Sequence, residues 1–131
     1  MRCGAWWRDE GGMTTPEEHA LRSYVESFNR HDIDAVMGCF VDDPTILDMS
    51  GNRHEGPEQV RKFYELQFAL FPDGRCDINA ITGHGATGMA ETAFHGTHAK
   101  SGRIVTACGP EVVEFVGDKI KELRDYHRLT S

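Results

Sequence analysis

The chain has 131 residues and a mass of 14.7 kDa, a size that suits a single domain. Its 39% hydrophobic and 27% charged residues are ordinary for a soluble globular protein, and its apolar runs are far too short to span a membrane. The net charge of −7, from 14 basic and 21 acidic residues without a cluster of Lys and Arg, predicts that neither nucleic acid nor a membrane is a partner.

The N-terminal residues predict where the domain begins, and together with the cysteines they predict the cellular compartment. Residues 1–13 show no helical or strand period, so we predict a loose extension there and one domain at residues 14–131. The first residues lack the basic and apolar stretches of a secretory signal. The four cysteines form no C-x-x-C pair, so we expect reduced thiols and a cytoplasmic protein.

Two helices are predicted at the start of the domain. T-P-E-E at residues 15–18 is a capping box with proline at the first helical position, so the first helix is expected over about residues 16–30. The second is expected after Asp32, with its apolar spacing running on to Phe40 and a break at Asp43-Pro44.

The rest of the chain predicts one more helix and then strands. A short strand is expected over residues 45–49, and a third helix begins at Gly56-Pro57 and ends before Pro72-Asp73-Gly74. From Arg75 onward, strand-like runs separated by glycine-containing turns predict a four-stranded antiparallel meander. Helices first and strands last predict an α+β fold, in which three N-terminal helices close one face of a cone-shaped, curved antiparallel sheet around a pocket.

Two glycine-containing segments and one pair of histidines need separate interpretation. Residues 83–88 fit the string G-x-G-x-x-G, but a strand rather than a helix follows, so we predict a hairpin turn. Gly109-Pro110 cannot continue an unbroken central strand, so a bulge or bend is expected immediately before Glu111. His95 and His98 would point to opposite faces of a strand, so no metal site is expected.

Three carboxylates fall on the apolar side of strand-like segments, where a charge is costly to bury. The period of two puts Asp48 with Ile46, Glu111 with Val113 and Phe115, and Asp125 with Leu123. Such acids protonate, find partners or line a wet cavity, so a buried acid/base site is the leading hypothesis. The alternatives are that Asp48 caps the turn at residues 50–52, that Glu111 lies half-exposed at an edge, and that Asp125 joins a surface charge network.

Longer strings of residues resemble a known family. T-P-E-E, then Y-V-E-S-F-N-R-H-D-I-D-A-V, F-V-D-D-P-T-I-L-D and G-P-E-Q-V-R-K-F-Y resemble the nuclear transport factor 2-like superfamily over about residues 14–129. F-P-D at 71–73, G-T-H at 96–98 and K-I-K-E-L-R-D at 119–125 resemble the SnoaL-like polyketide cyclases. The first helix and the first strand are equally similar to ketosteroid isomerases. This fold serves enzymes and binding modules alike.

The two resemblances imply different roles for the same residues. Similarity to the isomerases implies Tyr24 as the oxyanion tyrosine, Asp48 as the general base, and Glu111 as a protonated donor where that family has aspartate. Similarity to the cyclases implies Asp125 as the general acid/base, while Glu111 stands where those enzymes often carry histidine. His127, two residues after Asp125, would supply the missing imidazole and have its pKa raised by that aspartate.

The residues and the resemblance together predict a cofactor-free acid/base enzyme. It would act through an enolate on a small, apolar, polyketide-like or steroid-like carbonyl compound, as an isomerase or a cyclase. The expected apolar wall consists of Phe28, Phe40, Phe63, Phe94 and Phe115. The alternative is a non-catalytic module that holds a small molecule or a partner in the same pocket. The resemblance also implies a homodimer formed through the exposed face of the sheet.

Overall fold

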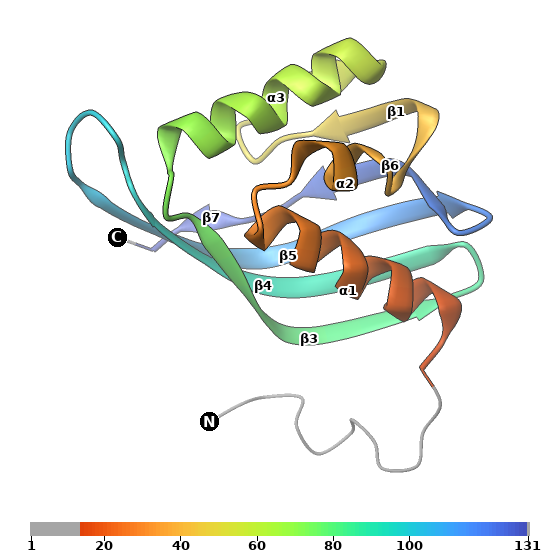
Figure 1. Ribbon diagram of the computed structural model, residues 1–131. Helices are drawn as coiled ribbons and strands as arrows, with labels where there is room; N and C mark the ends of the chain where they lie inside the picture. The colour runs from red at the N-terminus through yellow and green to blue at the C-terminus, as the bar shows by residue number, and fades with distance from the viewer. Residues whose placement is uncertain (1–13, 131) are drawn as a thin grey trace.

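The computed structural model describes residues 14–130, so the predicted extension at residues 1–13 lies outside the described part of the chain. Three helices lie over one face of a single curved sheet (Figure 1). The elements are α1 (Pro16–Asn29), α2 (Ile33–Met37), β1 (Phe40–Leu47), β2 (Arg53–Glu55), α3 (Pro57–Leu70), β3 (Arg75–His84), β4 (Thr87–Thr97), β5 (Ile104–Val116), β6 (Lys119–Asp125) and β7 (Arg128–Leu129).

The sheet is mixed and has the strand order β2-β1-β6-β5-β4-β3, with β7 paired to β5. The predicted antiparallel meander is confirmed as β3 to β6. The sequence did not predict the short strands β2 and β7, nor that β1 lies parallel to β6. This parallel pairing places the end of β1 beside the C-terminal strands.

The helix starts follow their capping residues as predicted. The Thr15 hydroxyl accepts a hydrogen bond from the Glu18 backbone N–H at 3.1 Å, and Asp32 Oδ1 accepts one from the Ala35 N–H at 3.1 Å. The predicted end of the second helix is wrong, because α2 stops at Met37 and Phe40 already belongs to β1.

Strand β1 therefore begins earlier than predicted and contains the proline that was expected to precede it. Phe40 pairs with Ile120 of β6, and the register shifts between Phe40 and Thr45. Pro44 lies within this irregular stretch, where the absence of its N–H interrupts no regular ladder. β1 also ends at Leu47, so Asp48 lies just beyond the strand instead of inside it.

The hairpin predicted for residues 83–88 is confirmed. His84 of β3 pairs with Thr87 of β4 across a two-residue turn. Both turn residues, Gly85 and Ala86, have positive φ angles of 55° and 60°, as the favoured tight hairpin turn requires. No helix follows, so the segment lacks the geometry of a dinucleotide-phosphate loop.

Of the bulge or bend predicted before Glu111, the bulge is wrong. The register between β4 and β5 runs without a shift through Gly109 and Pro110, and the irregularity in the β5 and β6 pairing lies later, between Glu114 and Phe115. Gly109 serves a different purpose. Its φ is 149°, and a Cβ there would lie 2.6 Å from the Tyr126 carbonyl oxygen and 2.9 Å from the His127 Cα. The missing side chain lets the connection from β6 to β7 approach β5 closely.

We expect Gly109→Ala to destabilise the fold and to displace His127. Backbone strain at this φ costs about 1–3 kcal/mol of unfolding free energy, and the clash adds to it. Gly102→Ala is the matched control, because Gly102 also has a positive φ (73°) but nothing lies within 4 Å of its Cβ position. Chemical denaturation measures both variants. Equal losses of stability in both would show that the close approach at Gly109 is unimportant.

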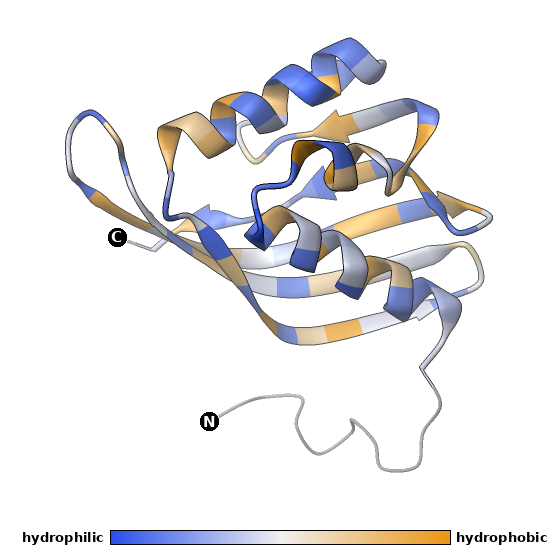
Figure 2. Cartoon of the chain, viewed as in Figure 1, coloured by the Kyte–Doolittle hydropathy of each residue, from blue (hydrophilic) through white to orange (hydrophobic). Residues whose placement is uncertain are grey.

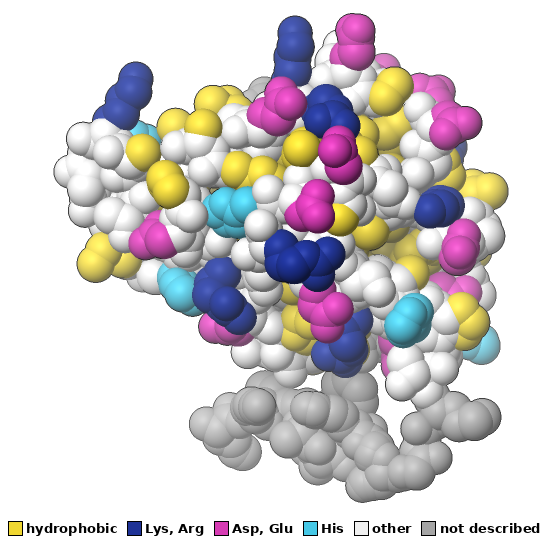
Figure 3. Space-filling model, viewed as in Figure 1, with side chains coloured by type: hydrophobic (Ala, Val, Ile, Leu, Met, Phe, Trp, Pro, Cys, Tyr) yellow, Lys and Arg dark blue, Asp and Glu magenta, His cyan; other side chains and the backbone are white. Residues whose placement is uncertain are grey.

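The core lies between the helices and the sheet, where apolar and polar residues alternate along the strands (Figure 2). Its members include Leu21, Val25, Val36, Phe40, Ile46, Val60, Val113, Phe115, Ile120 and Leu123. On the face seen in Figure 3, acidic and basic side chains are intermixed. Among the described residues, no helix is long and apolar enough to cross a membrane.

Candidate active site

A cavity of about 250 Å³ opens between the helices and the inner face of the sheet. Of the five phenylalanines predicted to form its wall, Phe28, Phe63 and Phe94 line it. Phe40 and Phe115 do not, because both are buried in the core. Phe71, which follows α3, lines the cavity in addition. The walls are thus largely aromatic and aliphatic.

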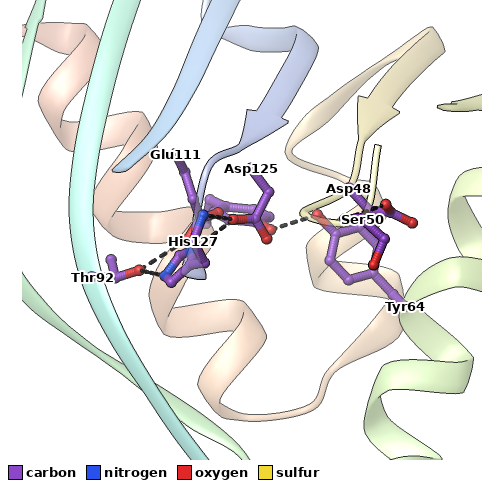
Figure 4. Close-up of polar contacts among 8 residues, drawn as sticks. Asp48, Ser50, Tyr64, Thr92, Glu111, Asp125 and His127 are labelled. Atoms are coloured by element: carbon purple, nitrogen blue, oxygen red, sulfur yellow. Dashed lines mark hydrogen bonds and ion pairs between the residues drawn. The ribbon is translucent and has the colours of Figure 1, made fainter. Parts of the chain in front are cut away.

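Four polar side chains form a hydrogen-bonded row on one side of this cavity (Figure 4). The Thr92 hydroxyl lies 3.1 Å from Glu111 Oε2 and 2.8 Å from His127 Nε2. At the other side of the imidazole, His127 Nδ1 lies 2.5 Å from Asp125 Oδ1. Glu111, Asp125 and His127 line the cavity, and Thr92 is fully buried behind them. The row therefore connects two carboxylates through an imidazole and a hydroxyl.

Strand pairing brings these residues together from three segments of the chain. Glu111 of β5 pairs with Asp125 of β6 on one side and with Ala90 of β4 on the other. Thr92 comes two residues after Ala90, so its side chain shares the inner face. His127 comes two residues after Asp125, and its backbone N–H donates to Asp125 Oδ1 at 2.9 Å, which fixes the chain beyond β6.

Glu111 is the most strongly perturbed acid of the row. Only 7% of the surface of Glu111 is exposed. Burial, and then the nearby Asp125 carboxylate, raise the pKa of Glu111 to about 7, against the opposing effects of His127 and of the Thr92 hydroxyl. Both protonation states are therefore accessible near neutral pH, which is what a general acid or a neutral hydrogen-bond donor requires. The sequence-based prediction of a buried Glu111 is confirmed.

His127 and Asp125 form a close pair. Burial by itself lowers the pKa of His127, but the hydrogen bond and the charge of Asp125, with a further contribution from Glu111, outweigh burial and raise it. Both hydrogen bonds between His127 and Asp125, from the backbone N–H and from Nδ1 of His127, go to Asp125 Oδ1. None of the hydrogen bonds found among residues 14–130 goes to Oδ2, so this oxygen is free to meet a ligand in the cavity.

A pair of tyrosines lies against the same cavity. The Tyr24 and Tyr64 hydroxyls lie 2.5 Å apart, and both rings line the cavity. Burial is the largest cause that raises the pKa of Tyr24 and of Tyr64 well above the usual tyrosine value. One hydroxyl donates to the other, which leaves the proton of the accepting hydroxyl for a ligand.

Asp48 does not join the other predicted acids. Its Oδ1 accepts from the backbone N–H groups of Ser50 and Asn52 at 2.9 Å each, and its Oδ2 lies 2.9 Å from His54 Nε2. Burial alone would raise the pKa of Asp48, but these hydrogen bonds lower it. Asp48 thus caps the turn that follows β1, as the simpler alternative predicted, and Figure 4 shows it apart from the row.

Two residues of the site were not singled out in the sequence. Thr92 is an ordinary strand residue whose partners lie 19 and 35 positions away, so only the strand register reveals its role. Tyr64 had a usable signal, because it resembles Tyr24 in carrying a hydroxyl on an apolar helix stripe. Within residues 14–130, no three His, Cys, Asp or Glu side chains are grouped closely enough to hold a metal ion.

Comparison with known proteins places the chain among similar folds. A family model described as SnoaL-like domain matches residues 21–123. A solved structure from Jannaschia sp. CCS1, provisionally described as a SnoaL-like polyketide cyclase, is 16% identical with a TM-score of 0.77, covering 93% of this chain and 90% of its own. No match is found among curated protein sequences.

Two further solved structures show the same fold. One from Xanthomonas campestris pv. campestris, provisionally described as a polyketide cyclase, is 20% identical with a TM-score of 0.77, covering 86% of this chain and 91% of its own. A hypothetical protein with a ketosteroid isomerase-like fold from Catenulispora acidiphila DSM 44928, in complex with trimethylamine, is 18% identical with a TM-score of 0.72, covering 85% of both chains.

Proposed function

Because the chain belongs to the SnoaL-like domain family of the nuclear transport factor 2-like superfamily, we propose that it is an acid/base enzyme acting on an apolar carbonyl compound through an enolate. The observation that carries this proposal is the row Asp125–His127–Thr92–Glu111 along an otherwise apolar cavity. An acid/base reaction needs one group that removes a proton and another that donates one. Two carboxylates in different environments on one cavity can fill these two roles. The proposed reaction requires no cofactor.

In this mechanism Asp125 is the general base. Its Oδ2 takes the proton from the carbon next to the carbonyl group, while Oδ1 remains hydrogen-bonded to His127. The imidazole holds the carboxylate in one orientation, as a positioned base requires. Asp48, the base implied by the isomerase resemblance, is not used, because its oxygens are engaged with the turn after β1 and with His54.

The negative charge that develops on the carbonyl oxygen needs hydrogen-bond donors. Tyr24 and protonated Glu111 supply them, with the Tyr64 hydroxyl donating to Tyr24 in support. Donors that are already oriented in a cavity shielded from water stabilise such an oxyanion more strongly than water does. The N-terminal helices close the substrate in, because α1 contributes Tyr24 and Phe28 to the cavity and α3 contributes Phe63 and Tyr64.

The size of the cavity narrows the substrate class. A dry cavity of about 150 Å³ holds one benzene ring, and sites for larger ligands begin at about 300 Å³. At about 250 Å³, this cavity holds one ring or two fused rings in full. A small polyketide-like carbonyl compound therefore fits better than a four-ring steroid, part of which would extend through the opening.

Exchange of carbon-bound hydrogen for deuterium tests the proposed reaction. The protein is incubated in D2O with a panel of ketones, such as 2-tetralone for two fused rings and 5-androstene-3,17-dione for a steroid, and the α-proton signals are followed by NMR. We expect faster loss of these signals than in buffer, with the smaller ketones preferred. A panel in which the ketones bind but exchange at the buffer rate would instead favour the non-catalytic binding module.

We expect Glu111→Gln to change the pH dependence of the reaction. Above pH 7 wild-type Glu111 becomes a carboxylate and loses its donor, whereas glutamine keeps a neutral N–H donor at every pH. The ratio of kcat/KM for the variant to that for wild type should therefore rise as the pH passes through about 7. Glu114→Gln, an exposed acid on the same strand, should give a constant ratio. A constant ratio for both variants from pH 5 to pH 9 would contradict the role of Glu111.

The predicted homodimer and cytoplasmic location belong to the same proposal. Exposed apolar residues on or beside the C-terminal strands support an interface there, namely Ile104, Val116 and Tyr126. The described cysteines, Cys39, Cys76 and Cys108, are free thiols, which supports a reducing compartment.

A further inference from the structure

We propose that the Thr92 hydroxyl is a proton relay between His127 and Glu111, so that these two side chains share one proton. Thr92 Oγ1 lies 2.8 Å from His127 Nε2 and 3.1 Å from Glu111 Oε2, both within hydrogen-bond distance. Thr92 has no exposed surface, so within the described chain its hydroxyl is directed to groups inside the fold. A relay residue for this cavity was not implied by the sequence.

A hydroxyl has one proton, and this limits the row to two arrangements with the same number of protons. In the first, His127 carries protons on both nitrogens, Nε2–H donates to Thr92, and Thr92 donates to the Glu111 carboxylate. In the second, Thr92 donates to a bare Nε2 and protonated Glu111 donates to Thr92. Two proton transfers convert the first arrangement into the second: one from His127 Nε2 to Thr92, and one from Thr92 to Glu111. The row neither gains nor loses a proton.

In both arrangements His127 Nδ1–H donates to Asp125, because Nδ1 lies 2.5 Å from Asp125 Oδ1. This pairing fixes the orientation of the ring, so Nε2 always faces Thr92. Asp125 thus holds the imidazole in the one position from which the relay works.

The other titratable groups around the row stay neutral over the pH range in which the proton is shared. They are Tyr24 of α1, Tyr64 of α3 and Cys76 of β3. Burial raises the pKa of each of these groups above its usual value. These three groups therefore do not take part in the titration of His127 and Glu111, and Thr92 is the hydroxyl that joins those two side chains.

The catalytic use of the relay rests on the proposed function. As the substrate C–H bond breaks, its proton forms an O–H bond to Asp125 Oδ2, and His127 loses the carboxylate charge that favoured its cationic form. The Nε2–H proton then passes to Thr92 Oγ1, and the Thr92 proton passes to Glu111 Oε2. Glu111 becomes neutral at the moment when negative charge develops on the substrate oxygen, and it donates to that oxygen once its single O–H turns away from Thr92. All protons are accounted for within the row and the substrate.

An NMR titration of the full chain without ligand tests the relay separately from catalysis. The ¹³Cδ signal of Glu111 and the ¹⁵Nε2 signal of His127 are followed from pH 5 to pH 9, and Glu111→Gln assigns the glutamate signal. In wild type we expect both signals to move with one common midpoint, because a shared proton leaves both groups together. Separate midpoints in wild type would overturn the proposal even if activity were found.

Substitution at Thr92 supplies the second measurement. Thr92→Val keeps the shape of the side chain but removes the hydroxyl, so the two midpoints should separate by about one pH unit or more. Thr92→Ser should restore the common midpoint, and Thr82→Val, at an exposed threonine of β3, should leave it unchanged. A Thr92→Val protein with the wild-type common midpoint would overturn the relay. If Thr92→Val does not fold, the wild-type titration alone decides.

Discussion

Asp125→Asn is expected to lower the turnover number by about 10²- to 10⁴-fold, the contribution of a general base. Asparagine has nearly the same shape, and its Oδ1 still accepts from the backbone N–H and the imidazole of His127. The change therefore removes the basic oxygen and leaves the local geometry in place. Steady-state kinetics on the fastest ketone of the panel measures the loss, and thermal unfolding confirms that the variant is folded.

Asp48→Asn is the matched control for this prediction. Asparagine keeps an acceptor for the Ser50 and Asn52 N–H groups and loses only the charge that faces His54. Turnover should stay within about a factor of three of wild type, with a small loss of stability. A large loss of turnover in Asp48→Asn with none in Asp125→Asn would assign the base to Asp48 and refute the mechanism.

Tyr24→Phe is expected to lower turnover by about 10²- to 10³-fold, the effect of removing one oxyanion donor. The ring continues to fill its place against Phe40 and Tyr64, so packing is preserved. The Tyr64 hydroxyl loses its partner, which should also cost about 1–3 kcal/mol of unfolding free energy. Kinetics and chemical denaturation measured on the same preparation separate the two effects.

Tyr64→Phe distinguishes the roles of the two tyrosines. If Tyr24 meets the substrate and Tyr64 only supports it, the Tyr64 variant should lose clearly less turnover than the Tyr24 variant at a similar cost in stability. Tyr126→Phe, at a half-exposed tyrosine, should change neither quantity. Equal turnover of Tyr24→Phe and wild type would exclude Tyr24 as an oxyanion donor.

Alternation along the strands was enough to place two of the three suspected acids. Glu111 and Asp125 lie inside paired strands, so the period of two correctly assigned them to the inner face with Val113 and Leu123. The same rule failed for Asp48, because β1 ends one residue earlier and the chain turns there. The period of two predicts the direction of a side chain only for residues inside the strand.

Contacts between distant segments account for what the sequence could not predict. The parallel pairing of β1 with β6 joins residues about 80 positions apart, and no local pattern indicates it. The same limit hid Thr92, whose role depends on how β4, β5 and the residues after β6 are aligned. Phe40 was assigned to a helix because its spacing fits one, but the helix ends at Met37 and Gly38 is its C-cap.

The rate of α-deuterium exchange on one ketone, compared between wild type and Asp125→Asn in D2O, shows whether the Asp125 carboxylate removes the substrate proton. The exchange rate records proton removal itself, so the measurement does not require the natural substrate or its product to be known. We expect exchange well above the buffer rate with wild type and a loss of about 10²-fold or more in the variant. Exchange that is equally fast with wild type and with Asp125→Asn would contradict this role of Asp125.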